Sequence, residues 1–481
     1  MASYPHGVFV TEQATSLAAP VKGTAGLQVI FGTAPINLLK NPEAAVNKPL
    51  LAYSYHEAVE AVGYHADFAR YTLCESISAN FTVVNTCPII LVNVLDPKKH
   101  SADLNEQEVA VADGVAMIQE TGILLNDLKV KHGETELERD VDYTAAFQND
   151  GTLHLAILAD GVDKVTVSGK KLAPDKVTPM DIVGGVDTAT GEETGLEIVR
   201  QIYPKFGMTP GILLAPRFSK DAAVAAALQA KTTEINGTFK AVCIVDIDSS
   251  RESGAVKYAD VKEQKEKQGV TSENAYGVWL YGKVGNAVYS GSALAAALTA
   301  YTDAQNGNLP STSPSNKTIA ISAACLEDGT EVLLDQEQAN TVNGFGVATW
   351  LNMNGFRLWG NNTACYPGKT DPKDRWFSVR RFMSWAANTF ILTYFQKVDN
   401  PMNKRLIESI LDSERIRGNA FVNQGVCARY ELSYNKEDNP TTSLLDGKLR
   451  FRQYITPFPP AEKIENTIEF DPYALESALG G

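Results

Sequence analysis

The stretch KAVCIVDID, residues 240–248, decides the fold of this chain. It is a continuous apolar run that ends in two acidic residues, the pattern of a strand buried on both faces of a parallel sheet. Runs of the same kind lie at 27–31, 89–94 and 211–216, and helical patterns at 52–64, 221–231 and 292–307 alternate with them. The order of strands and helices predicts an α/β layer, and residues 343–360 predict a hairpin or strand pair at its end.

Residues 98–182 have a different texture, with short alternating segments such as LKVKHG and KVTVSGKKL separated by glycine turns. This pattern predicts a small antiparallel β domain inserted into the α/β layer. Residues 101–200 hold 20 acidic and 8 basic residues, which accounts for most of the net charge of −14. We therefore expect a solvated outer lobe. An acidic chain repels phosphate, which argues against nucleic-acid binding.

The last 115 residues form a further unit. A helix is predicted at 375–398, and a second helix is predicted from Asn400 as its cap and Pro401 as its first residue to Gly418. Two strands are expected at 426–434 and 448–456. The proline-rich linker TPFPPAEK then leads to a last extended run, IENTIEF, at 464–470. A similar short β-type run, Gly7 to Thr11, lies near the start of the chain.

Targeting signals are missing from the sequence. No stretch approaches the roughly 18 uninterrupted apolar residues that cross a bilayer. The beginning, MASYPHGVFVTEQ, lacks the basic start and apolar run of a signal peptide. We therefore expect a soluble protein made in the cytoplasm. The six cysteines are scattered without metal-binding spacing, and several of them lie in apolar runs and are interpreted as small core residues.

Catalytic motifs are also missing. All six histidines lie before residue 155, so the α/β region after 182 contains none for a Ser-His-Asp or Cys-His arrangement. No glycine-rich segment has the form of a phosphate-binding loop. Asp246 and Asp248 end a predicted strand, where carboxylates commonly meet water, and neither Asp303 nor Glu327 has a partner at metal-ligand spacing. The sequence predicts no catalytic residue, no cofactor and no metal site.

Several motifs, in order along nearly the whole chain, resemble the phage tail sheath family. They include IVGGVDTATGEETGLEIVRQIYPKFGMTPGILLAPRFS (182–219), SGSALAAALTAYTDAQNGNLPSTSPSNKTI (290–319) and QANTVNGFGVATWLNMNGFRLWGNNT (338–363). FSVRRFM (377–383), VDNPMN (398–403), TPFPPAEKIENTIEF (456–470) and the opening PHGVFVTE match further landmarks. Asn362 departs from the family, where arginine is common, and His6 interrupts the usual Pro-Gly pair.

The resemblance implies a three-part fold of class α/β plus β. Its parts are a subtilisin-like, non-catalytic, doubly wound core, an inserted β-sandwich and a C-terminal α+β domain. The expected boundaries are a terminal arm at 1–22, the core at 23–97 and 183–364, the acidic outward-facing insertion at 98–182, a tube-proximal domain at 365–460 and a second arm at 461–481.

The two isolated strands at the chain ends suggest how copies join. A single strand is not stable alone and must complete a sheet edge. We expect each to be donated to a neighbouring copy, which yields an open helical polymer. The expected donors are Gly7, Val8, Phe9, Val10, Thr11, Ile464, Glu465, Asn466, Thr467, Ile468, Glu469 and Phe470. The expected acceptors are Ala428, Arg429, Tyr430, Glu431, Leu449, Arg450, Phe451 and Arg452. The alternative is that both strands fold back onto their own subunit.

Basic residues on the predicted C-terminal helices are candidates for contact with an acidic tube, although solvated helix charges would give the same pattern. These candidates are Arg380, Arg381, Lys404, Arg405, Arg415 and Arg417.

The resemblance implies the function of a contractile tail sheath subunit. Such a subunit assembles helically around a tail tube, is held in an extended metastable state, and contracts to drive the tube through a cell envelope. The implied partners are further copies of the chain, the tube protein, and the baseplate and tail terminator proteins, without insertion into a membrane. The implied location is a virion or tail-like particle. A degenerate hydrolase and a cell-surface binding protein remain as alternatives.

Overall fold

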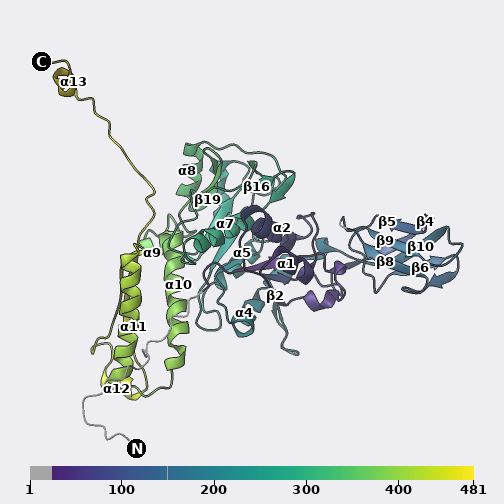
Figure 1. Cartoon of the computed structure of the whole chain (residues 1–481), viewed down its shortest axis with the longest axis horizontal. Helices are drawn as coiled ribbons and strands as arrows, with labels where there is room; N and C mark the ends of the chain where they lie inside the picture. The colour runs from purple at the N-terminus through teal and green to yellow at the C-terminus, as the bar shows by residue number, and fades with distance from the viewer. Residues whose placement is uncertain (1–23, 149, 481) are drawn as a thin grey trace, which may run out of the picture.

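The computed structural model describes residues 24–148 and 150–480, and its centre is an eight-stranded sheet in the order β2-β3-β1-β13-β14-β15-β19-β20 (Figure 1). The strands are β1 (Gln28–Gly32), β2 (Pro49–Ala52), β3 (Ile89–Asn93), β13 (Ile212–Leu214), β14 (Val242–Ile247), β15 (Ala275–Trp279), β19 (Val347–Asn352) and β20 (Phe356–Trp359). The six inner strands are parallel, and the edge strands β2 and β20 run antiparallel to their neighbours.

The apolar run at 240–248 forms β14, in the middle of this sheet, as predicted. All of its residues are buried, and Cys243–Ile247 pair in register with Ala275–Trp279. Burial on both faces explains why the run does not alternate between apolar and polar residues. The hairpin predicted at 343–360 is also confirmed as the antiparallel pair β19–β20.

Helices cover this sheet, and α7 packs across β13, β14 and β15. Side chains of Ser54, Asp221 and Ser290 cap the starts of α1, α5 and α7. The helices are α1 (Tyr55–Val62), α2 (Thr72–Ser78), α3 (Pro179–Val183), α4 (Val199–Phe206), α5 (Ala222–Ala230), α6 (Val261–Lys267), α7 (Gly291–Gln305) and α8 (Gln336–Gly344). Two small sheets complete the body, β17–β16–β18 (Ala287–Tyr289, Tyr281–Val284, Ala323–Cys325) and β11–β12 (Gly185–Val186, Glu193–Thr194).

The segment between β3 and α3 forms a seven-stranded antiparallel sheet that projects from the body (Figure 1). Its order is β7-β6-β10-β4-β5-β9-β8. The strands are β4 (Ser101–Ala112), β5 (Val115–Ile118), β6 (Lys129–His132), β7 (Thr135–Leu137), β8 (Tyr143–Phe147), β9 (Leu153–Ile157) and β10 (Lys164–Leu172). It has a hydrophobic core of its own, which includes Leu104, Tyr143 and Val167.

The C-terminal unit stands beside the body as an antiparallel helix pair with a two-stranded sheet (Figure 1). Its elements are α9 (Pro372–Arg375), α10 (Phe377–Tyr394), α11 (Lys404–Asn423), β21 (Cys427–Ser433), α12 (Thr441–Leu445) and β22 (Arg452–Pro457). An extended segment then leads away from this unit to α13 (Pro472–Ala478) near the C-terminus (Figure 1). Within the described residues, no helix is long and apolar enough to span a membrane.

The second C-terminal helix differs from its prediction at both ends. Its cap is Asn403, whose side chain accepts a hydrogen bond from the backbone N–H of Leu406, so the Asn400-Pro401 pair lies in the preceding connection. The helix also continues through Gly418 to Asn423. Gly418 faces β21, and a side chain there would collide with the carbonyl oxygen of Tyr430. This glycine therefore permits a close helix–strand contact and does not end the helix.

Candidate surface for strand exchange

The sheet formed by β21 and β22 has one packed and one exposed face. The pair Tyr430–Ile455 points toward the helices, whereas the pair Glu431–Tyr454 points outward. Within the described residues, the two strands pair only with each other. Each therefore has one edge whose backbone N–H and C=O groups are open to a further strand.

The expected acceptor residues fall on this sheet only in part. Ala428, Arg429, Tyr430 and Glu431 lie in β21, and Arg452 is the first residue of β22. The prediction is wrong for Leu449, Arg450 and Phe451, which precede β22. The cause is Asn439, whose side chain accepts from the N–H of Arg450 at 2.7 Å and donates to its carbonyl oxygen at 2.8 Å. These bonds occupy the backbone of Arg450 within its own loop.

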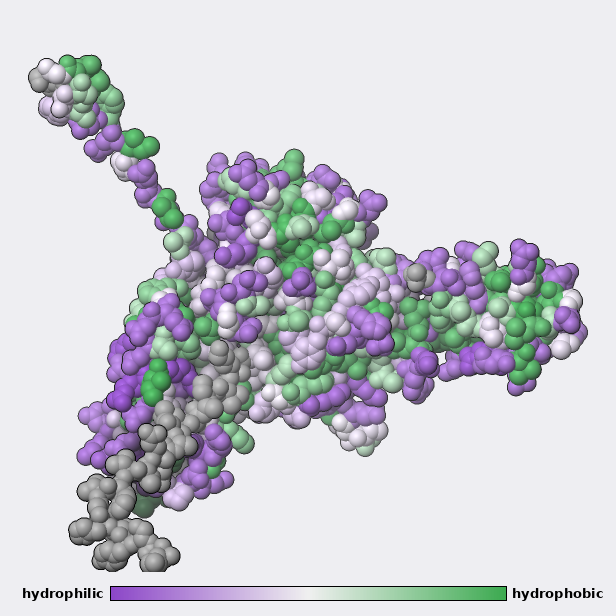
Figure 2. Space-filling model, in the orientation of Figure 1, coloured by the Kyte–Doolittle hydropathy of each residue, from purple (hydrophilic) through white to green (hydrophobic). Residues whose placement is uncertain are grey.

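The expected C-terminal donor, Ile464–Phe470, belongs to no strand of its own chain. Its large apolar side chains are almost fully exposed: 87% for Ile464, 87% for Ile468 and 80% for Phe470. Figure 2 shows the segment extending away from the body, with hydrophobic and hydrophilic residues along it. Exposed apolar residues in such a row indicate a surface that another molecule covers. The N-terminal donor, Gly7–Thr11, lies outside the described residues.

An arginine holds the root of this C-terminal segment. Arg375, at the end of α9, donates from Nη2 to Oε2 of Glu462 at 2.9 Å and from Nε to Oδ1 of Asn362 at 2.8 Å. Its guanidinium carbon lies 4.0 Å from the ring centroid of Trp376 and 4.3 Å from that of Tyr366. These contacts fix the chain two residues before the extended run begins.

A second arginine, Arg381 of α10, lies where the described chain begins. It donates from Nη1 to Oδ1 of Asp303 at 2.8 Å and from Nη2 to the carbonyl oxygen of Ala25 at 3.0 Å. Both charged side chains are buried, at 2% and 3% exposed. The guanidinium therefore joins the C-terminal unit to helix α7 and to Ala25, near the first described residue.

The structure corrects the expectation that six basic residues lie on accessible helix faces. Arg381 is buried against Asp303, and Arg417 is only 9% exposed because it donates to Glu414 at 2.6 Å. Glu414 is itself fully buried and also accepts from the hydroxyl of Tyr394. Lys404, Arg405 and Arg415 are exposed, and Arg380 is largely covered beside Asp374.

Asp246, at the end of β14, lies in a closed hydrogen-bond network. Its carboxylate accepts from the backbone N–H and hydroxyl of Ser292, both at 2.7 Å, and from the hydroxyl of Ser219 at 3.0 Å. Burial raises the pKa of Asp246, although these hydrogen bonds oppose the shift. The two serines are fully buried. The network caps the start of α7, and its burial leaves no access for a substrate. The expectation that Asp246 meets water is wrong.

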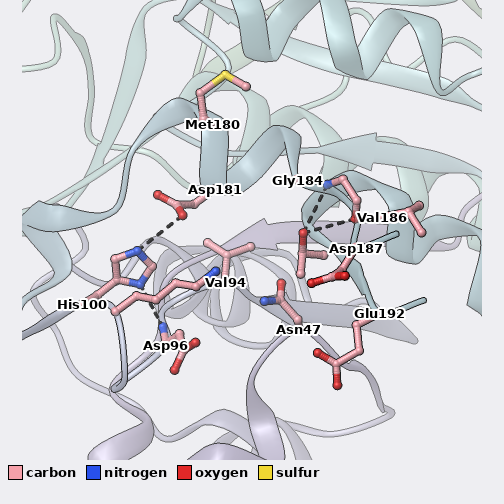
Figure 3. Close-up of a pocket in the computed structure, with 13 residues that line it drawn as sticks. Asn47, Val94, Asp96, His100, Met180, Asp181, Gly184, Val186, Asp187 and Glu192 are labelled. Carbon is pink, nitrogen blue, oxygen red and sulfur yellow. Dashed lines mark hydrogen bonds and ion pairs between the residues drawn. The ribbon is translucent and has the colours of Figure 1, made fainter. Parts of the chain in front are cut away.

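A cavity of about 380 Å³ lies at the root of the seven-stranded sheet (Figure 3). His100, before β4, has its Nε2 3.4 Å from Oδ1 of Asp181 in α3. Its Nδ1 accepts from the backbone N–H of Asp96, which fixes the ring. Burial tends to raise the pKa of Asp181, but hydrogen bonds from Thr178 and the nearby His100 outweigh it and lower the pKa. The pair ties together the two chain crossings of the projecting domain.

Metal ligands do not gather in the described part of the chain: no three His, Cys, Asp or Glu side chains there are placed to hold an ion.

Sequence reasoning missed both arginine anchors. Arg375 and Glu462 are 87 residues apart, and Arg381 and Asp303 are 78 apart. No local pattern links such distant residues. A hydrophobic pattern does indicate which face of α10 is buried, but Arg381 is a charged residue on that face.

Comparison with known proteins finds relatives along the whole chain. No family model matches it. It is 26% identical over its full length to the tail sheath protein of Burkholderia phage BcepMu, covering 99% of that protein. It is 29% identical over 62% of its length to a putative prophage major tail sheath protein of Pseudomonas aeruginosa, covering 74% of that protein.

Solved structures share the fold. The sheath of an extracellular contractile injection system, the PVC sheath complex in its contracted state, has a TM-score of 0.59 at 14% identity over 98% of this chain and 99% of that one. The helical sheath of the anti-feeding prophage in its contracted state has a TM-score of 0.57 at 16% identity over 98% and 100%. The full-length match in sequence, the shared fold and the ordered motifs agree, and each of them relates this chain to contractile tail sheath proteins.

Proposed function

We propose that this protein is the structural subunit of a contractile tail sheath, in which copies are joined by strands donated from their chain ends. The subunit assembles helically around a tail tube, is held in an extended metastable state, and contracts to drive the tube through a cell envelope. Its partners are further copies, the tube protein, and the baseplate and terminator proteins of a virion or tail-like particle.

The observation that carries this proposal is that one chain has both a candidate donor strand and a candidate acceptor sheet, which do not pair with each other. The donor is the exposed run Ile464–Phe470, and the acceptor is the two-stranded sheet β21–β22 with its open edges. With about four or five backbone hydrogen bonds at roughly 0.5–1.5 kcal/mol each, one donated strand contributes several kcal/mol. Because donor and acceptor lie on different surfaces, the contact continues from copy to copy and does not close.

The three units have separate places in this polymer. The seven-stranded domain, whose sequence is acidic, faces outward, the α/β body carries the bulk, and the C-terminal unit lies near the tube. Lys404, Arg405 and Arg415 are exposed on α11 and are the remaining basic candidates for tube contact, together with Arg380. The relatives of this chain are structural proteins, and the buried Asp246 network supports a core without catalysis.

Removal of the donor tests the proposal. A chain that ends at Lys463 should fold but form no tubes in negative-stain electron microscopy, whereas a chain that ends at Asp471 keeps the strand and should form them. A chain lacking residues 1–15 tests the N-terminal donor in the same way. Full-length tubes from the chain that ends at Lys463 would exclude C-terminal strand donation.

A further inference from the structure

The C-terminal tether, residues 458–463, joins β22 to the donated strand. One residue of this tether, Glu462, forms an ion pair with Arg375 at the end of α9. We propose, on the basis of the sheath function above, that this pair is a latch that gives the link between copies two lengths. With the latch closed the receiving copy is held close to α9, and with it open that copy can lie farther away.

The two residues of the latch are held differently: Arg375 has several further contacts, whereas Glu462 is on an extended segment. Arg375 is held by the rings of Trp376 and Tyr366 and by Asn362, so its guanidinium keeps its orientation whether or not Glu462 is present. Glu462 is 37% exposed and lies on an extended segment without regular structure. Because water reaches the carboxylate, opening requires little desolvation or repacking and the pair is weak enough to switch.

The two lengths follow from the chain itself. From Glu462 to Ile464 there are two residue steps, so the closed latch places the start of the donated strand within about 7 Å of the anchor. From Pro457, the end of β22, to Ile464 there are seven steps, or up to about 24 Å. Pro459 and Pro460 keep the freed tether extended, so most of this reach is available.

The shorter link belongs to the contracted state. Contraction requires a second packing of the same subunits, and we assign the short tether to that packing. The structure has the latch closed, with Arg375 already oriented by its aromatic neighbours. We assign this closed form to the relaxed subunit, so that its opening is a cost carried by the extended state. Latch closure in every subunit would then add to the driving force for contraction.

Spin-label distances test this assignment in assembled sheaths. Labels at Lys463→Cys and at Asn419→Cys in α11 report the tether position within one subunit when labelled chains are diluted with unlabelled ones. Cys87→Ser removes the cysteine that is exposed among the native six. In contracted sheaths we expect a narrow distribution of label-to-label distances. In extended sheaths we expect a broader distribution whose mean differs from that of contracted sheaths by at least about 10 Å. Identical distributions, or a narrow one confined to extended sheaths, would overturn the latch.

A charge variant provides the second test. Glu462→Gln should still assemble, but its contracted sheaths should show the broad distance distribution, and contraction should be about two- to fivefold slower. The matched control is Glu437→Gln, a substitution of an exposed glutamate in the β21–α12 connection, which should change neither. If wild-type protein forms no tubes, the sheath function itself fails. If tubes form and contract but neither labels nor Glu462→Gln show a change, only the latch fails.

Discussion

Arg381 and Asp303 form a buried ion pair that joins helix α10 of the C-terminal unit to helix α7 of the α/β body. The same guanidinium donates to the carbonyl oxygen of Ala25, the second described residue of the chain. Arg375, six residues earlier, holds Glu462 at the root of the C-terminal segment. Residues 375–381 therefore contact both Ala25, near the first described residue, and Glu462, two residues before the exposed run 464–470.

Loss of one partner of the buried pair should destabilise the chain strongly. Arg381→Met leaves Asp303 as a buried charge, and burial already raises the pKa of this carboxyl against the effect of Arg381. We expect the free energy of unfolding to fall by about 3–5 kcal/mol, and the double variant Arg381→Met with Asp303→Leu to regain most of it. Urea unfolding of the unassembled chain measures both.

The control for this prediction is Arg415→Met, which removes an arginine that is 71% exposed beside Asp412. It should change the free energy of unfolding by less than about 1 kcal/mol. A double variant no more stable than Arg381→Met would show that the pair does not act through its buried charge.

The two faces of the donated strand should respond differently to a new charge. Ile464 and Ile468 lie on one face of an extended run, and Thr467 lies on the other. Ile468→Asp puts a carboxylate where apolar burial is expected, so sheath formation should be lost in negative-stain images, with thermal unfolding unchanged. Thr467→Asp should still assemble. Equal effects of the two substitutions would argue against a strand with one buried face.

Gly418 should tolerate no side chain. In Gly418→Ala the new methyl group meets the carbonyl oxygen of Tyr430, so α11 and β21 must separate. We expect a loss of about 1–3 kcal/mol in the free energy of unfolding and weaker strand acceptance by the displaced sheet. Gly344→Ala in α8 is the control, because a side chain there meets open space. Near-ultraviolet circular dichroism during unfolding follows both, and an unaffected Gly418→Ala would show that the contact is not tight.

Lys265 should give stability a dependence on alkaline pH. Burial lowers the pKa of Lys265 from 10.5 to about 8, and its amine donates to the carbonyl oxygens of Phe345 and Tyr366. Between about pH 8 and 10.5 the unfolded chain binds a proton at this residue that the folded chain does not, so this contribution to stability increases with pH.

The measurement is the difference in free energy of unfolding between wild type and Lys265→Met at several pH values. The comparison cancels the other titrating groups. We expect this difference to move in favour of wild type by about 3 kcal/mol from pH 7.5 to pH 10.5. A difference that is constant over this window would show that the amine is not desolvated.

The sequence by itself determined the elements whose signal is local. The apolar run at 240–248, the hairpin at 343–360 and the extended run at 464–470 are visible as patterns, because burial on two faces, one face or none leaves a distinct period in the chain. The ordered family motifs and the absence of histidine after residue 154 restricted the function in the same way.

Only the tertiary structure decided which charged residues are accessible and which hold the units together. Arg381, Arg415 and Arg417 look alike in sequence, but only Arg415 is exposed. Arg381 is buried against Asp303, 78 positions away, and Arg417 is buried against Glu414, 3 positions away. Asn439 keeps Leu449–Phe451 in a loop and out of β22. The contact with β21 explains why Gly418 lies inside α11 and does not end it. Whether a charge is buried depends on which other elements pack over it, and no local pattern encodes that packing.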